Sequence, residues 1–114
     1  MFIKNVDARK KENAPSCTVW EYDFPSKELW FAIVDINGRF PESGKAVNHQ
    51  CDEIYYIIEG EWTIHQETGD YIIKQWDAFF FEKGKRYRVE GNNLKINVST
   101  TPARFLQQYE NIPW

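Results

Sequence analysis

The side chains most able to do chemistry lie together in one short stretch, Asn48 to Gly60. His49, Cys51 and Glu53 alternate there, and an unbroken apolar run from Ile54 to Ile58 follows them. If the stretch is one extended strand, these three side chains point to the same face. An imidazole, a thiol and a carboxyl can bind a metal or exchange protons. We therefore expect a functional site where this strand enters an apolar interior.

The elements that must position these groups are short strands. Aromatic residues make up 17% of the 114 residues. Turn signals recur at Asn37-Gly38, Ser43-Gly44, Gly60, Thr68-Gly69, Lys83-Gly84 and Gly91-Asn92-Asn93. Between them we expect strands at Thr18–Asp23, Trp30–Ile36, Glu53–Glu59, Glu61–Gln66, Tyr71–Lys74, Ala78–Glu82, Tyr87–Glu90 and Leu94–Thr100. Many short strands without a helical period predict an all-β sandwich or barrel.

The length of the chain fits one domain, which we place at residues 1–114. Residues 1–16 read as an arm that is either peripheral or swapped across a dimer. The charged stretch Asp7–Ser16 is expected to be the least ordered part.

Charge and cysteine content narrow the functional classes. A net charge of -3 argues against binding to nucleic acid or to an anionic membrane. No segment resembles a signal peptide or approaches the roughly 20 apolar residues of a membrane span. Cys17 and Cys51 form no CxxC motif, so we expect a cytoplasmic protein with reduced thiols, although a disulfide between them stays open.

Two of the expected strands are apolar on both faces. In Ile54–Ile58 the residues on either side of the strand are hydrophobic, and the same holds for Phe79–Phe81. A sheet normally leaves one face to water, so the outer face of these strands must be covered. In so small a chain the simplest cover is a second copy, which predicts a homodimer.

From Gly44 to about Arg88 the chain resembles the cupin superfamily. The first cupin motif is a glycine, a His-x-His pair, a glutamate three or four residues on, six more residues and a glycine. Glu53 and Gly60 match its second half, and His49 matches the second histidine with three intervening residues. The first histidine falls on Val47, which has no metal-binding atom.

The second cupin motif and the C-terminal end carry a weaker resemblance. Trp76-Asp77 replaces its Gly-Asp pair, Glu82-Lys83-Gly84 replaces Pro-x-Gly, and Tyr87 stands at its histidine. Thr101-Pro102-Ala103 with Gln108-Tyr109-Glu110 looks like the tail of one-domain cupins. The resemblance implies a double-stranded β-helix, the cupin jelly-roll barrel, with the ligand positions facing one cavity.

The incomplete motifs imply that no cofactor is bound. Metal-containing cupins use three histidines and one glutamate, and only His49 and Glu53 match two of those four positions. Two ligands leave an ion largely hydrated and weakly held. A weak divalent metal at His49 and Glu53 stays open, with Cys51 as a third ligand.

Three uses of the cavity stay open. The leading one is binding of a small sugar or carboxylate metabolite by His49, Cys51, Glu53, Tyr55, Tyr87 and Trp30. The second is a metal-free sugar isomerase or epimerase, with His49 as base, Tyr87 as acid and a phosphate-binding cation among Arg39, Lys45 and Arg86. The third is a vestigial His49–Glu53 ion pair that satisfies only itself.

Overall fold

The structure is a computed structural model that describes residues 1–114. Most of its residues lie in strands. The strands are β1 Arg9–Ala14, β2 Cys17–Tyr22, β3 Trp30–Phe40, β4 Lys45–Asn48, β5 Asp52–Gln66, β6 Gly69–Ile73, β7 Ala78–Phe81, β8 Arg86–Thr101 and β9 Tyr109–Ile112. Two short 3-10 turns, η1 Asn5–Asp7 and η2 Leu106–Gln108, complete the chain. Neither of these short turns has the length or the apolar character of a membrane-spanning helix.

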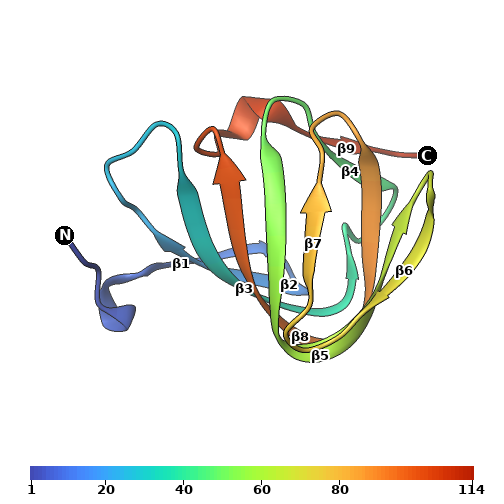
Figure 1. The fold of residues 1–114 in the computed structure, drawn as a ribbon, viewed down its shortest axis with the longest axis horizontal. Helices are drawn as coiled ribbons and strands as arrows, with labels where there is room; N and C mark the ends of the chain where they lie inside the picture. Colours follow the sequence, from blue (N-terminus) through green and yellow to red (C-terminus); the bar gives the residue numbers. More distant parts are fainter.

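All strand pairs are antiparallel and belong to one nine-stranded sheet. The order β1-β2-β3-β8-β4-β9 forms one path, and β5 pairs with β6, β7 and β8. Figure 1 shows that this sheet curls around on itself, with the long strands β5 and β8 running along the bottom of the curl. The expected all-β jelly-roll barrel is confirmed, as one domain with its interior inside the curved sheet.

The curl depends on bulges where the sequence suggested turns. The pairing of β5 with β8 shifts register between Ile57 and Glu59 and again between Glu59 and Glu61. Gly60 has a φ of +98°, and a Cβ there would lie 2.8 Å from the Asn93 carbonyl oxygen. Bulges increase local bend and twist, and glycine permits both the φ and the close approach. The expected turns at Asn37-Gly38, at Gly60 and at Gly91–Asn93 are therefore wrong, because β3, β5 and β8 each continue through them.

Three strands were not expected from the sequence, and they are β1, β4 and β9. The charged stretch expected to be least ordered instead contains β1, which pairs with β2 of the same chain. Lys10 lies opposite Trp20 in this pair, with its ammonium 5.8 Å from the Trp20 ring centroid. Cross-strand contacts therefore stabilise a strand whose side chains are mostly exposed.

The hydrophobic core lines the inner face of the curl. Along β5 the side chains of Glu53, Tyr55 and Ile57 are buried, while Ile54 and Tyr56 point outward. This alternation confirms the predicted strand with two different faces. The core also takes up Trp62, which is 1% exposed and packs against Gly91 on the neighbouring strand.

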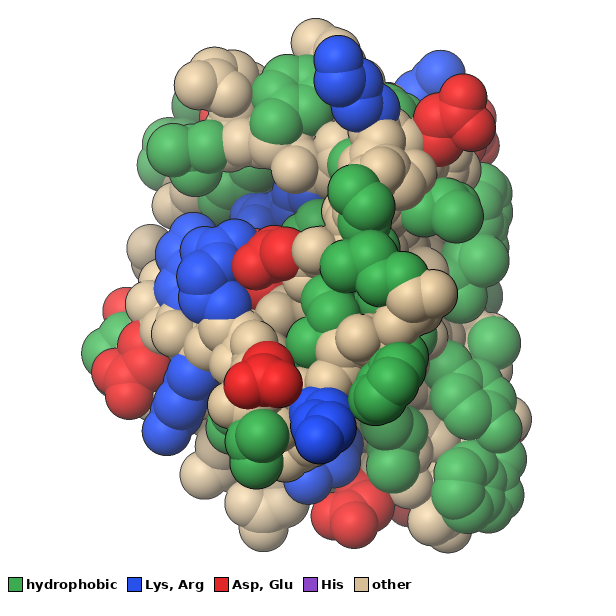
Figure 2. All heavy atoms as spheres, turned by 90° about the vertical axis from the view of Figure 1, so that its left-hand side faces the viewer, with side chains coloured by type: hydrophobic (Ala, Val, Ile, Leu, Met, Phe, Trp, Pro, Cys, Tyr) green, Lys and Arg blue, Asp and Glu red, His purple; other side chains and the backbone are tan.

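The outer face of the sheet carries an exposed apolar row. The row crosses neighbouring strands in register and consists of the aromatic or aliphatic residues Tyr22, Phe31, Ile54 and Phe80, with Ser99 between Phe31 and Ile54. Ile54 is 46% exposed and Phe80 is 57% exposed. Figure 2 shows hydrophobic side chains gathered along the right-hand side of that view. The sheet face thus lacks a cover within the chain itself.

Candidate functional site

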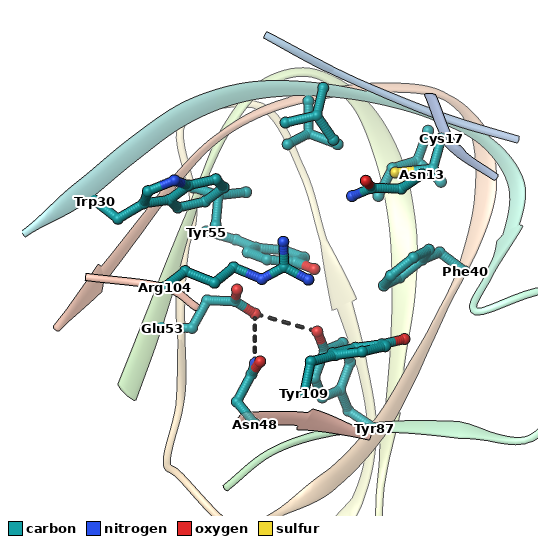
Figure 3. Close-up of a pocket in the computed structure, with 14 residues that line it drawn as sticks. Asn13, Cys17, Trp30, Phe40, Asn48, Glu53, Tyr55, Tyr87, Arg104 and Tyr109 are labelled. Carbon is teal, nitrogen blue, oxygen red and sulfur yellow. Dashed lines mark hydrogen bonds between the residues drawn. The ribbon is translucent and has the colours of Figure 1, made fainter. Parts of the chain in front are cut away.

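A small cavity lies inside the curved sheet, between β5, β8 and the segment that follows β8. Its volume is about 40 Å³, which is room for water or one small chemical group. Most of its wall is apolar or aromatic. The lining residues are Asn13, Cys17, Val19, Trp30, Val34, Ile36, Phe40, Asn48, Glu53, Tyr55, Tyr87, Val98, Arg104 and Tyr109, and Figure 3 shows how the polar ones lie.

Glu53 is the central polar group of the cavity. Its side chain comes from the inner face of β5 and is only 5% exposed. The Oε1 atom of Glu53 accepts one hydrogen bond from Asn48 Nδ2 at 3.3 Å and another from the Tyr87 hydroxyl at 3.2 Å (Figure 3). Asn48 is held in this orientation because its own Oδ1 accepts a hydrogen bond from Gln108 Nε2 at 2.9 Å.

The pKa of the Glu53 carboxyl lies near neutral pH. Burial raises the pKa of Glu53 from 4.5 to about 7, because an ionised carboxylate loses its hydration there. The nearby Arg104 charge and the hydrogen bonds from Tyr87 and Asn48 oppose this rise in pKa but do not cancel it. A carboxyl with such a pKa can take up or release a proton at physiological pH.

The phenols beside Glu53 stay neutral. Burial, and then repulsion from the Glu53 carboxylate, raises the pKa of Tyr55 and of Tyr87 well above 10. The two rings pack around Phe81, whose centroid lies 4.5 Å from that of Tyr55 and 4.4 Å from that of Tyr87. Both phenols therefore serve the cavity as rigidly held hydroxyl groups that can donate hydrogen bonds.

A single arginine reaches into the cavity. Arg104 lies on the segment between β8 and η2, and Figure 3 shows its guanidinium extending across the cavity above Glu53. The Arg104 Cζ atom lies 5.7 Å from the Trp30 ring centroid and 5.4 Å from that of Tyr109. These distances fall within the range of cation–π contacts. The expected cations Arg39, Lys45 and Arg86 do not line the cavity.

His49 does not lie in the cavity, contrary to the expectation from the sequence. Its side chain is 49% exposed, and its Nε2 atom lies 2.8 Å from Glu110 Oε1 on the surface. The reason is local, because β4 ends at Asn48, residues 49 and 50 form a bend, and β5 begins at Asp52. His49 and Glu53 therefore do not belong to one continuous strand, and their side chains do not point to the same face. A His49–Glu53 pair and a His49–Tyr87 acid–base pair are both wrong in this geometry.

Cys51 is fully buried but is not among the residues that line the cavity. Cys17 does line it, and burial raises the pKa of the Cys17 thiol to about 12, so this sulfur is a poor nucleophile and a poor metal ligand. Both cysteines are free in this structure, so the disulfide left open from the sequence is not present in it.

The residues present do not fit a cupin metal ion. With four residues between the second histidine and the glutamate, the first motif falls on Ala46, Asn48 and Glu53, and Asn48 and Glu53 both face the cavity. Tyr87 occupies the fourth position. The motif glutamate is kept as Glu53, but a methyl group, an amide and a neutral phenol replace the three histidines. No three His, Cys, Asp or Glu side chains cluster anywhere in the chain. The set His49, Cys51 and Glu53 does not converge.

The structure thus brings together Glu53, Tyr55, Tyr87 and Trp30 and leaves out His49 and Cys51. Sequence reasoning missed Asn48 and Arg104. The four-residue spacing of the first motif would have found Asn48, and the tail motif after Pro102 brackets Arg104. Of the other tryptophans, Trp62 belongs to the core and Trp76 is 61% exposed.

Comparison with known proteins places the fold. No protein-family model and no curated protein sequence matches the chain. A Streptomyces Pac13 variant solved with uridine aligns with a TM-score of 0.86 at 10% identity, over 100% of this chain and 90% of its own. Pac13 is described as a nucleoside dehydratase.

Two further solved structures are similar over most of their length. KdgF from Halomonas sp. aligns with a TM-score of 0.76 at 16% identity, over 91% of this chain and 96% of its own. An RmlC-like cupin from Shewanella frigidimarina aligns with a TM-score of 0.74 at 18% identity, over 90% of this chain and 91% of its own. At sequence identities this low, the similarity establishes the fold and nothing about function. The chain has the cupin fold, as its motifs predicted.

Proposed function

We propose that the chain binds a small polar metabolite of the sugar or carboxylate class in the cavity around Glu53. The observation that carries the proposal is the buried carboxyl of Glu53, held by Asn48 and Tyr87 and facing a cavity with aromatic walls. A buried ionisable group is costly unless something offsets it, and such groups concentrate at functional sites. Aromatic walls with a few convergent polar groups are typical of ligand pockets.

The space next to the cavity supports a ligand larger than its inner volume. A wider hollow of about 240 Å³ adjoins it and shares Asn13, Phe40, Arg104 and Tyr109 with it. A ligand can therefore place one polar group against Glu53 and the rest of its body in the outer hollow. The similar Pac13 structure was solved with uridine, which is a ligand of this general size and polarity.

Titration calorimetry with uridine, D-glucose and D-glucuronate tests the binding proposal. We expect one of these probes to bind, and we expect Glu53→Gln and Tyr87→Phe to weaken it by roughly tenfold each, because each change alters a polar contact in a desolvated site. His49→Ala is the matched control and should bind as the unmodified chain does, since His49 lies on the surface. Binding that survives both cavity changes, or no binding of any probe, would contradict the proposal.

A second candidate function is proton transfer at a carbon next to a carbonyl. The pKa of Glu53, raised to about 7 by burial, favours it because both protonation states are then populated at physiological pH. In this proposal Glu53 takes the proton, and the neutral Tyr87 hydroxyl stabilises the developing oxyanion. Tyr87 and Glu53 lie side by side, 3.2 Å apart, rather than on opposite faces of a ligand. This arrangement favours isomerase-type transfer on one face over epimerase chemistry.

Deuterium exchange tests the second candidate. In D₂O we expect the chain to exchange the hydrogen next to the carbonyl of an added ketose or uronate, as followed by loss of its proton NMR signal. Glu53→Gln removes the base and should abolish the exchange, whereas Cys51→Ala should leave it unchanged. Equal exchange in the unmodified chain and in Glu53→Gln would refute this role, while leaving the binding proposal intact.

We also propose that the apolar row on the outer sheet face contacts a second copy of the chain. Within this row Ile54 is 46% exposed and lies on a strand whose other face is core. Sedimentation velocity at micromolar concentration should show a dimer, and Ile54→Lys should convert it to a monomer. Ile72→Lys is the matched control, because Ile72 is 66% exposed on β6 away from the row. A monomeric unmodified chain would overturn this proposal. A location in the cytoplasm stays a prediction from the sequence.

A further inference from the structure

The Arg104 guanidinium has no anionic partner within the chain. Two other arginines form ion pairs with carboxylates. Arg9 pairs with Glu21 and Asp23, and Arg88 pairs with Glu90. Arg104 instead makes its contacts with the faces of Trp30 and Tyr109. Contact with ring faces holds a guanidinium in place while leaving its N–H donors free at the edge. Arg104 is therefore fixed in position without having its charge neutralised.

Glu53 is not an ion-pair partner of Arg104. Arg104 acts on the Glu53 carboxyl through space, yet no ion pair forms between them, and Glu53 Oε1 is engaged by Asn48 and Tyr87. Burial raises the pKa of the Glu53 carboxyl to about 7, so this group carries only part of a negative charge at neutral pH. The cavity therefore presents a guanidinium without an ion-pair partner above a partly protonated acid.

Arg104 also stands at the junction of the two hollows. It lines the inner cavity with Glu53 and the outer hollow with Lys11, so a second cation stands on the outer side. Glu12 is the one carboxylate that lines the outer hollow. A ligand lying across the junction meets Arg104 whichever part of it enters the inner cavity.

We propose that Arg104 anchors an anionic oxygen group of the ligand, a carboxylate or a phosphate, while the polar remainder of that ligand reaches Glu53. This inference rests on the proposed binding function and specifies its ligand class as anionic. A guanidinium offers two parallel donors that match both kinds of anion. The aromatic contacts keep those donors in one place before the ligand arrives, which lowers the entropy lost on binding.

Small anions probe the anchor directly. Sodium acetate and inorganic phosphate are titrated into the ¹⁵N-labelled chain through the millimolar range, against sodium chloride at equal ionic strength. We expect one of the two anions to shift the Arg104 Nε–H and Trp30 indole N–H signals beyond the shift that chloride causes. Acetate and phosphate thus distinguish a carboxylate site from a phosphate site.

Variants of Arg104 separate the anchor from general charge effects. We expect Arg104→Met to abolish the anion-specific shift of the Trp30 indole N–H signal. We also expect this variant to weaken D-glucuronate binding relative to D-glucose binding by roughly tenfold or more. Arg104→Lys should bind at an intermediate level, because lysine keeps the charge but loses the two-pronged donor geometry. Arg86→Met is the matched control, since Arg86 lies 5.7 Å from the Trp114 ring centroid outside the cavity.

The outcomes distinguish this inference from the function on which it rests. If uridine or D-glucose binds through Glu53 while acetate and phosphate act as chloride does, the anion anchor is wrong and the binding proposal stands. If the anions bind at Arg104 and no sugar or nucleoside binds, the anchor stands and the wider proposal fails. If acetate or phosphate still shifts the Trp30 indole N–H signal beyond the effect of chloride in Arg104→Met, the anchor is overturned.

Discussion

Replacing Glu53 by glutamine should make the folded chain more stable at neutral and alkaline pH. The carboxyl is 5% exposed, and burial raises its pKa from 4.5 to about 7. The folded state therefore holds a proton that the unfolded state releases between these two pH values. For such an acid, stability is greatest below pH 4.5 and falls as the pH rises through 7. Glutamine stays neutral throughout and can still accept the hydrogen bonds from Asn48 and Tyr87.

The expected size of the effect follows from the two pKa values of Glu53. The difference between 4.5 and about 7 corresponds to about 3 kcal/mol of folding free energy, lost by the unmodified chain as the pH rises through this window. Glu53→Gln avoids this loss. We therefore expect the variant to match the unmodified chain near pH 4.5 and to exceed it by about 3 kcal/mol at pH 8, or roughly 10 °C in Tm.

Urea denaturation from pH 4.5 to pH 8, followed by circular dichroism, measures the difference. Glu67→Gln serves as the control, because Glu67 lies exposed in the turn between β5 and β6 and should leave the pH profile unchanged. A ¹³C NMR titration of the Glu53 carboxyl reports its pKa independently. Parallel pH profiles for Glu53→Gln and the unmodified chain would refute the reasoning, because the cavity would then not penalise the ionised carboxylate.

Three further predictions follow from individual contacts. Tyr87→Phe removes a hydrogen bond that favours the ionised carboxylate, so it should raise the pKa of Glu53 further, as read from the same ¹³C signal; a lowered pKa would contradict this. Gly91→Ala should destabilise the fold by about 1–3 kcal/mol in urea denaturation, because its Cβ would lie 2.6 Å from the Trp62 ring; an unchanged midpoint would show that the ring moves aside. His49→Ala should change stability by less than about 1 kcal/mol, since its pair with an exposed carboxylate is solvated, and a larger loss would count against the surface placement.

The fold was readable from the sequence because it depends on local patterns. Many short, closely spaced strands without a helical period indicated an all-β sandwich or barrel. Alternation along the expected strand Glu53–Glu59 put Glu53 and Tyr55 on one face, and both are buried inside. Strand boundaries were less predictable, because a glycine such as Gly60 serves a turn and a bulge equally well, and only the facing strand decides between them.

The composition of the site was decided by tertiary structure. A bend at residues 49 and 50 turns His49 to the surface and gives its expected place to Asn48, and a bend of this kind leaves no periodic signal. Arg104 reaches the cavity because the segment after β8 folds back over Trp30, a contact between residues more than seventy positions apart in the chain. The sequence by itself determined the barrel and the buried acid within it. Which cation and which amide surround that acid depended on how distant segments pack, and the pattern of a single strand does not specify that packing.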